Sequence, residues 1–283
     1  MVLLACGQLS YNEPASNLPM SELTHSFILP AYNESERLTT SIPKVLEYVH
    51  ERGLQAEIIV VSDGSTDATA EVVQQFAAAN PMIVLLENPG NRGKGYSVRN
   101  GMLHAKGAFA LFTDADLSSP ITEADKLFAA LADGADVAIG SRWLKREMQT
   151  ERQPFYRQLY GRLFNLGLSI ILRLDYRDTQ CGFKAFTRQA IQVIFTRQRV
   201  ERWGFDPELL YLARKYKLKT VEVPVEWAHD HRSKINPFRD GLRMGLDVLQ
   251  IRWNALMGRY ARPSAPLLDT AASQPSNPVE LTK

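Results

Sequence analysis

The chain has 283 residues, of which 45% are hydrophobic and 23% are charged, an ordinary globular composition with enough apolar residues for a sizeable core. Its formal net charge at pH 7 is only +2, so the charge balance gives no reason to expect a nucleic-acid partner. Its two cysteines lie far apart, which excludes a disulfide framework and a cysteine metal site and favours a reducing compartment.

The two ends of the chain differ from its middle. Residues 1–24 and 262–283 are rich in serine, proline, alanine and asparagine without periodicity, so we predict a flexible N-terminal tail and a disordered C-terminal tail. The start, MVLLACGQLS, lacks the basic residues and long apolar run of a secretory signal. No apolar run reaches the ~18 residues of a membrane span. We place one domain over residues 25–228 and an amphipathic helical segment over residues 229–261.

The first half of that domain alternates short apolar runs with segments of helical spacing. The apolar runs, which we predict as strands, are SFILPAY, AEIIVVSD, MIVLLEN, AFALFTDA and DVAIGSR. The helical segments between them are Ser35–Arg52, Asp67–Ala79, Gly95–Ala105 and Thr122–Ala132. This alternation predicts an α/β fold with a mostly parallel central sheet and helices on both faces.

Four of the predicted strands end in polar residues. These ends are Tyr32 to Glu34, Asp63 to Ser65, Asn88 to Asn91, and Asp114 to Asp116. Ligands of open α/β sheets bind at the carboxyl ends of the strands, so we expect the four ends to line one cleft. A single aspartate in such a place is more often a helix N-cap, which is our prediction for Asp67.

The stretch NPGNRGKGYSVRNG is rich in glycine and follows the third predicted strand. It matches neither the dinucleotide-binding fingerprint, which follows a first strand, nor the P-loop pattern. Its glycines alternate with Arg92, Lys94 and Arg99 at a predicted helix start, an arrangement that suits an anion.

Asp114 and Asp116 stand one residue apart at the end of an apolar run, and like charges this close repel each other. A nearby cation would offset the repulsion. Carboxylate oxygens suit Mg²⁺ or Mn²⁺, and Mg²⁺ commonly combines one or two carboxylates with the phosphates of a substrate. We therefore predict a divalent metal that arrives with a nucleotide diphosphate.

The second half of the chain is more basic and more amphipathic. Arginine and lysine outnumber acids in Gly140–Asn165 and in His229–Arg262, which indicates either an anionic partner or a solvated charged face. Gln153–Arg173 and Gly241–Met257 have helical apolar spacing. One face of the latter carries Leu242, Leu246, Leu249, Trp253 and Leu256. Two interpretations stay open for both helices, core packing and contact with a membrane surface.

The segments between these two helices give further elements. DTQCGFKAF predicts a strand and a turn, and Asp206–Tyr216 predicts a helix. KTVEVPVEW predicts an edge strand, because Pro224 has no N–H to donate to a ladder.

Several of these motifs together resemble a known family. ILPAYNES, EIIVVSDGSTDAT, NRGKGYSVRNGM, FTDADLSSP and GSR, in this order, resemble the family 2 glycosyltransferases with the GT-A fold. DTQCGFKAFTRQA, VERWGFDPELLYLA and VEVPVEW, followed by SK, resemble the dolichyl-phosphate β-glucosyltransferases and, less closely, the dolichyl- and polyprenyl-phosphate mannosyltransferases. The likeness covers roughly Ser26 to Tyr260, so it implies that residues 25–228 are a GT-A catalytic domain.

The resemblance implies a role for individual residues. Pro30, Tyr32 and Glu34 fall where the family holds the base and ribose, and Asp63 falls near the uracil. The remaining implied positions are Lys94 beside the nucleotide sugar, Asp114 and Asp116 on the ribose, diphosphate and metal, Arg142 and Arg157 near the two phosphates, and Lys234 near the lipid phosphate.

The sequence departs from the family in two respects. Ser62 replaces the usual first aspartate of the D-D-G-S motif, which puts the base contacts in doubt. The eukaryotic glucosyl enzymes resembled here also carry an N-terminal membrane anchor, and we find none in this sequence.

The activity implied by the resemblance is an inverting, metal-dependent transfer of a hexose. The expected donor is UDP-glucose, the expected acceptor is a polyprenyl or dolichyl phosphate, and the expected cofactor is Mg²⁺ or Mn²⁺. A phosphate monoester is mostly a dianion at pH 7 and needs no general base. That agrees with the scattered positions of the five histidines. We expect a peripheral protein at the cytoplasmic face of the membrane.

Other functions remain open at this point. A mannosyltransferase that uses GDP-mannose and a family 2 glycosyltransferase with a non-lipid acceptor are the nearest alternatives. A nucleotidyltransferase that makes the activated sugar is less favoured, because it leaves the amphipathic segments unexplained. A non-catalytic nucleotide-binding regulatory module needs neither the acid pair nor a basic second half. The oligomeric state is not indicated.

Overall fold

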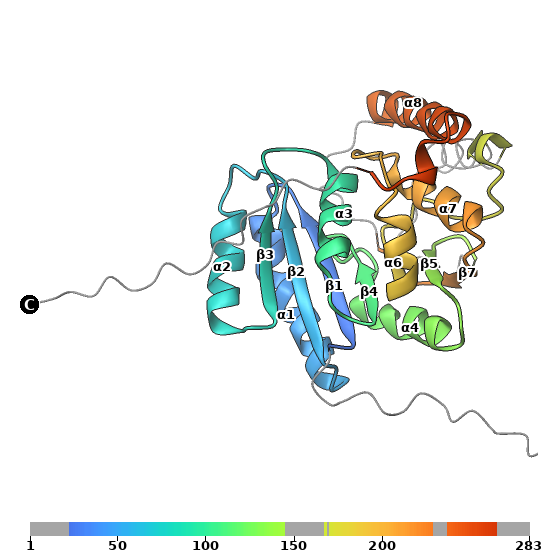
Figure 1. Cartoon of the computed structure of the whole chain (residues 1–283). Coiled ribbons are helices and arrows are strands. Elements are labelled where there is room, and N and C mark those ends of the chain that lie inside the picture. Colours follow the sequence, from blue (N-terminus) through green and yellow to red (C-terminus); the bar gives the residue numbers. More distant parts are fainter. Residues whose placement is uncertain (1–22, 145–166, 169, 229–236, 265–283) are drawn as a thin grey trace, which may run out of the picture.

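The computed structural model describes residues 23–144, 167–168, 170–228 and 237–264. In this part of the chain, a seven-stranded sheet lies between two layers of helices (Figure 1). The strands are β1 (His25–Ala31), β2 (Ala56–Ser62), β3 (Ile83–Glu87), β4 (Phe109–Phe112), β5 (Val137–Ser141), β6 (Lys184–Thr187) and β7 (Thr220–Pro224). The helices are α1 (Ser35–Glu51), α2 (Thr69–Ala79), α3 (Lys94–His104), α4 (Ala124–Ala132), α6 (Arg188–Ile194), α7 (Phe205–Lys215) and α8 (Pro237–Leu256). Two 3-10 turns, Ile121–Glu123 and Arg259–Ala261, precede α4 and follow α8.

The strand order across the sheet is β3-β2-β1-β4-β6-β5-β7. Every neighbouring pair is parallel except the two pairs that β6 makes, with β4 and with β5. The predicted α/β fold with a mostly parallel sheet and helices on both faces is therefore confirmed. The reversal of β6, which was not predicted, sets its first residue Lys184 opposite Phe112 and Ile139, near the carboxyl ends of β4 and β5.

Successive residues of each strand point to opposite faces, so the sheet separates two cores. On β1, Ile28 faces one core, while Phe27 and Leu29 face the other. The first core is closed by α3, α6 and α7, with one side of α8 above them, and the second by α1, α2 and α4. Both cores consist of fully buried aliphatic and aromatic side chains, which hold the strand ends in fixed positions.

The elements of the second half differ more from the predictions. β7 is the edge strand predicted from Pro224, since among the described strands it pairs only with β5. Helix α6 was not predicted, because seven residues are too few to show a helical period, but Thr187 caps it by accepting a hydrogen bond from the N–H of Ala190 at 3.2 Å. Of the predicted helix Gln153–Arg173, residues 167–168 and 170–173 lie within the described residues, and all of these except Arg173 are helical.

The predicted C-terminal segment is tied to the rest of the fold in its described part. Val248 and Ile251 of α8 and Tyr260 of the following turn are buried in the first core. Ser264 donates to the carbonyl oxygens of Thr196 at 2.7 Å and Gln198 at 3.0 Å. The described chain thus continues three residues into the range predicted as a disordered tail, and the rest of that tail lies outside the described residues.

Candidate active site

The polar strand ends meet as predicted. After β1, the side-chain oxygen of Asn33 accepts the N–H of Thr66, which follows β2, at 2.8 Å. After β3, the amide of Asn88 donates to Asp63, which follows β2, at 2.8 Å. These cross-links join the ends of three parallel strands into one polar edge. Asp67 does not cap α2 from the N-cap position, which Ala68 occupies, but its carboxylate accepts the N–H of Thr69 at 3.0 Å.

Asp63 is almost fully buried and holds the loop in front of α3. Besides Asn88, it accepts the backbone N–H of Arg92 at 3.0 Å and of Gly93 at 2.7 Å. Its two oxygens therefore accept the backbone N–H groups just before α3. From the sequence, we had expected the start of this helix to bind an external anion. The uracil contact implied for Asp63 stays a prediction.

The glycine-rich loop does not present three cations to one anion. Arg92 pairs with Glu201 at 3.0 Å, and the Nε of Arg99 donates to the carbonyl of Phe195 at 2.9 Å. A Cβ on Gly95 would come within 2.7 Å of the carbonyl oxygen of Val200. This glycine therefore serves the close packing of α3 against residues 200–205, and among these three cations the structure pairs only Lys94 with the acid pair.

Lys94 forms an ion pair with Asp114. Its side chain is 16% exposed, and its Nζ lies 5.5 Å from the centre of the Trp203 ring. Burial lowers the pKa of Lys94, but the charges of Asp114, Asp206 and Asp116 outweigh burial and hold that pKa above its usual value. The cation that offsets the repulsion of the acids is therefore, in the first place, a lysine of this chain.

A second ion pair, buried beneath the first, joins Lys184 of β6 to Asp206 of α7. Lys184 is fully buried, and burial raises the pKa of Asp206 although both neighbouring lysines lower it. The order Asp114, Lys94, Asp206, Lys184 alternates negative and positive charges from the cleft into the core, so the buried charges compensate one another. Sequence reasoning missed both members of the deeper pair, although a charged residue inside the apolar runs CGFKAF and WGFDPEL was the available signal.

The two acids of the pair have different surroundings. Asp114 lies against Gly182, where any side chain on the glycine would collide with the carboxylate. Asp116 accepts the N–H of Ser118 at 2.9 Å and its hydroxyl at 2.8 Å. Across the described residues, no three carboxylate, histidine or cysteine side chains gather closely enough to hold a metal ion. The chemistry of two carboxylates fits a Mg²⁺ or Mn²⁺ ion that takes its other ligands from substrate phosphates and water.

Arg142 follows β5 and is oriented by Asp178. Its Nε and Nη2 donate to the two carboxylate oxygens at 2.7 and 2.8 Å, and its backbone N–H donates to the same group at 3.0 Å. Burial lowers the pKa of Arg142, but the charge of Asp178 outweighs burial and holds the pKa above its usual value. The charge of Asp114 acts in the same direction. A two-pronged contact of this kind fixes the plane of the guanidinium. Sequence reasoning identified Arg142 and missed Asp178.

The residues implied for the base and ribose lie around the end of β1. Pro30 is buried within the strand, whereas Tyr32 directly after it is 42% exposed. Glu34 accepts two hydrogen bonds from Arg37, at 2.9 and 2.7 Å. Ser62, at the position of the missing aspartate, donates to the hydroxyl of Ser65 at 3.2 Å. Nucleotide contacts of these residues stay predictions, and Arg157 and Lys234 lie outside the described residues.

Residues 199–204 connect the acid pair to the C-terminal helix. Glu208 of α7 accepts the N–H of Arg199 at 3.1 Å, the N–H of Val200 at 2.8 Å and the hydroxyl of Tyr260 at 2.6 Å. Burial raises the pKa of Glu208 to about 7. One buried carboxyl group thus holds both the loop and the turn after α8.

Helix α8 has apolar side chains on two sides. Val248 and Ile251 are buried, but five large apolar residues at its other side and end are more than half exposed. We call this set the apolar face of α8: Leu246, Leu249, Trp253, Leu256 and Met257. The described members of the face predicted from the sequence are therefore exposed. None of the helices within the described ranges combines the length and hydropathy that crossing a bilayer requires.

Comparison with known proteins gives consistent matches. Residues 26–195 match the family model Glycosyl transferase family 2. A dolichyl-phosphate beta-glucosyltransferase of Drosophila melanogaster is 39% identical over 248 residues, covering 83% of this chain and 76% of that protein. Proteins of the same name from Trichomonas vaginalis and Homo sapiens are 38% and 34% identical, covering 80% and 83% of this chain and 72% and 76% of those proteins.

Two solved structures are similar in fold. Mannosyl-3-phosphoglycerate synthase from Rubrobacter xylanophilus has a TM-score of 0.62 at 20% identity, over 87% of this chain and 78% of that one. Glucosyl-3-phosphoglycerate synthase from Mycobacterium tuberculosis, in complex with Mn²⁺, uridine diphosphate and glucosyl-3-phosphoglycerate, has a TM-score of 0.59 at 19% identity, over 90% and 88% of the chains. These likenesses confirm the GT-A glycosyltransferase architecture.

Proposed function

We propose that this chain, which belongs to glycosyl transferase family 2, transfers glucose from UDP-glucose to a polyprenyl or dolichyl phosphate and forms a β-linked glycolipid. The observation that carries the proposal is the 34–39% identity to dolichyl-phosphate beta-glucosyltransferases over most of the chain. The arrangement of side chains supports it, because an acid pair, a half-buried lysine and an oriented arginine stand together at the carboxyl edge of the sheet.

The proposed donor site lies around Asp114 and Asp116. These carboxylates would hold Mg²⁺ or Mn²⁺ against the diphosphate, where the metal neutralises charge on the departing group. Lys94, which the charge of Asp206 also attracts, keeps the Asp114 carboxylate in place from below. Tyr32, Glu34 and Asp63 are proposed to contact the nucleoside, as the resemblance implies.

The proposed reaction needs no proton transfer. An oxygen of the acceptor phosphate dianion forms a bond to the sugar C1 while the bond from C1 to the diphosphate oxygen breaks, so UDP leaves and the configuration inverts. The four negative charges of the two substrates reappear as three on UDP and one on the glycosyl phosphodiester. The chain therefore has to bring two anions together, and we assign this task to Arg142, Arg157 and Lys234.

The proposed acceptor is a lipid, and the apolar face of α8 supports this assignment. An exposed row of leucine and tryptophan side chains is typical of a helix that lies on a membrane surface. Arg252 on the same helix would face anionic headgroups. We therefore propose peripheral binding at the cytoplasmic face of the membrane.

The proposal is tested by transfer assays with three donors. The protein is incubated with Mn²⁺ and undecaprenyl phosphate, and with UDP-glucose, GDP-mannose or UDP-GlcNAc in separate reactions. We expect a glycolipid from UDP-glucose only. A product from GDP-mannose alone would replace the proposed donor with that of the mannosyltransferases. Transfer to 3-phosphoglycerate without any transfer to the lipid would instead assign a soluble acceptor.

A further inference from the structure

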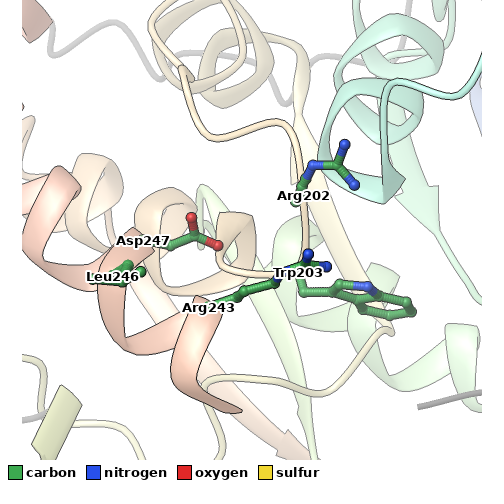
Figure 2. Close-up of a pocket in the computed structure, with 5 residues that line it drawn as sticks. All are labelled: Arg202, Trp203, Arg243, Leu246 and Asp247. Atoms are coloured by element: carbon green, nitrogen blue, oxygen red, sulfur yellow. The ribbon is translucent and has the colours of Figure 1, made fainter. Parts of the chain in front are cut away.

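A cavity of about 520 Å³ lies between the loop that precedes α7 and the first described turns of α8 (Figure 2). Its lining combines two cations, one acid and two apolar side chains: Arg202, Trp203, Arg243, Leu246 and Asp247. Figure 2 shows the side chain of Arg243 extending from α8 toward Trp203 on the loop. A lining with charged and apolar members together suits a ligand that has an ionic end and an apolar body.

The cavity adjoins the donor site through one aromatic ring. Trp203 lines the cavity, and the Nζ of Lys94 lies 5.5 Å from the centre of its ring. Lys94 is in turn paired with Asp114. A ligand in the cavity is therefore separated from the acid pair by the Trp203 ring and the Lys94 side chain. The cavity therefore neighbours the proposed donor site.

The cavity also adjoins the apolar face of α8. Leu246 belongs to both, and Leu249, Trp253 and Leu256 follow it at helical spacing along the exposed side of the helix. An apolar chain that leaves the cavity past Leu246 would therefore continue along this row, in which every side chain is apolar.

The charges of the lining favour an anion. Within the described part of the chain, Arg202 and Arg243 are exposed and form no ion pair or hydrogen bond, although the charge of Arg202 acts on the carboxyl group of Asp247. Asp247 is turned to the loop, where it accepts the N–H of Gly204 at 3.1 Å. Gly204 has no room for a side chain, since a Cβ there would collide with Asp247. The acid thus fixes α8 against the loop, and the two arginines leave the lining with a net positive charge.

We infer that this cavity is an acceptor subsite, in which Arg202 and Arg243 bind the phosphate of a lipid phosphate monoester and Leu246 contacts the first carbons of its chain. The inference rests on the proposed function and assigns roles that the resemblance does not imply, to Arg202 inside the stretch VERWGFDPELLYLA and to Arg243 outside all the quoted stretches. Guanidinium groups match phosphate oxygens in charge and geometry. Trp203 is assigned as the wall that both substrates share.

The test uses decyl phosphate, a soluble alkyl phosphate, in calorimetric titrations of the full chain. Inorganic phosphate and decanol are titrated separately, because they carry only the ionic or only the apolar half of the ligand. We expect decyl phosphate to bind at least about tenfold more tightly than either half. Binding of inorganic phosphate with equal affinity would show a site for free phosphate and overturn the lipid assignment.

The phosphate-binding role of the two arginines is tested with a double variant that combines Arg202→Gln and Arg243→Gln. Charge-assisted hydrogen bonds of this kind predict a loss of roughly ten- to a hundred-fold in affinity for decyl phosphate. Lys215→Gln on α7 is the control, because Lys215 is an exposed cation that does not line the cavity and has no role assigned above. UDP affinity and the melting temperature should not change in either variant. Unchanged decyl phosphate affinity in the double variant would overturn the inference.

The two proposals fail in different ways. Glucosyl transfer to undecaprenyl phosphate with full efficiency in the Arg202→Gln, Arg243→Gln variant would leave the proposed function intact and remove the subsite. Absence of transfer in the wild type with every donor would remove the proposed function. In that case decyl phosphate binding still tests whether the cavity takes a lipid phosphate.

Discussion

The proposed donor site around Asp114, here called the donor end, and the proposed acceptor cavity beside α8, here called the acceptor end, are built in opposite ways. At the donor end, Asp114, Lys94, Asp206 and Lys184 form a mostly buried sequence of alternating charges, and each is neutralised by its neighbours. At the acceptor end, Arg202 and Arg243 are exposed around a cavity, and the apolar face of α8 is exposed beside it. The four charges of the first region balance one another without a ligand, whereas the second region would become neutral and covered only when a charged, apolar molecule binds.

The comparison implies that changes at the donor end affect catalysis and folding together, while changes at the acceptor end affect binding alone. Preorganised charges stabilise a transition state without rearranging, but they also contribute to the stability of the fold. Exposed side chains that wait for a ligand contribute little to stability.

Replacement of Asp116 by alanine should have the largest effect. Loss of metal-mediated stabilisation of the leaving group is worth several kcal/mol, so we expect transfer to fall about a thousand-fold or more. The fold should persist, because Asp116 accepts hydrogen bonds only from Ser118 in its own turn, among those described. Initial rates and melting temperatures measure both effects. The exposed Asp133→Asn is the control, and an Asp116→Ala enzyme with wild-type rates would contradict the metal assignment.

The buried pair beneath the site tests whether the donor end also supports folding. Lys184→Met leaves Asp206 buried without its main partner, which predicts a loss of about 3–5 kcal/mol in the free energy of unfolding. The double variant Lys184→Met, Asp206→Leu should recover part of this loss, since it removes both buried charges. Urea unfolding of the two single variants and the double variant gives the coupling energy. A loss below about 1 kcal/mol in Lys184→Met would contradict the assigned role.

The buried carboxyl group of Glu208, which holds the loop at Arg199 and the turn after α8, should make the stability of the fold depend on pH. Its pKa is raised from 4.5 to about 7, so the folded state holds this proton more tightly than the unfolded state. The stability that Glu208 contributes is fully present below pH 4.5 and is lost as the pH rises through about 7, by up to about 3 kcal/mol. Glu208→Gln should lack this dependence. The check is the difference in unfolding free energy between the two proteins from pH 4.5 to 8, and a constant difference would refute the prediction.

The smallest effect is expected at the proposed membrane surface. Arg252→Gln removes one cation from α8, worth about 1 kcal/mol near an anionic bilayer, or roughly fivefold in partitioning. Flotation with anionic liposomes at low salt measures the bound fraction. Lys44→Gln on α1, which covers the opposite face of the sheet, is the control and should bind like the wild type. Failure of the wild type itself to float would remove the membrane proposal.

The sequence predicted the donor end better than the acceptor end, for physical reasons. Parallel strands show as continuous apolar runs, and their polar ends mark one edge, so the sheet and the position of Asp114 and Asp116 were predictable. The partner of Asp114 was not, because Lys94 precedes it by twenty positions and the pairing depends on how α3 packs. The packing role of Gly95 was not predicted, since close packing and anion binding both favour glycine there.

The acceptor end depends on contacts between residues far apart in the sequence, which hydrophobic periodicity and short motifs do not reveal. The periodicity of α8 predicted one apolar face, but the helix also buries Val248 and Ile251, and the sequence could not say which side is exposed. The cavity exists because Gly204 lets Asp247 approach the loop, a contact across forty-three positions. The predicted roles of Arg157 and Lys234 remain predictions, because both residues lie outside the described chain.

The fastening of α8 has a geometric consequence for a protein on a membrane. Asp247 holds the helix to Gly204, and Tyr260 after its end holds Glu208, so the helix is attached to the same part of the fold at two points. It has little freedom to tilt against the cleft. If its apolar face rests on a bilayer, the acid pair stands at a set height above the lipid surface. The lipid phosphate, and not the protein, would then have to move across the distance between the lipid surface and the acid pair.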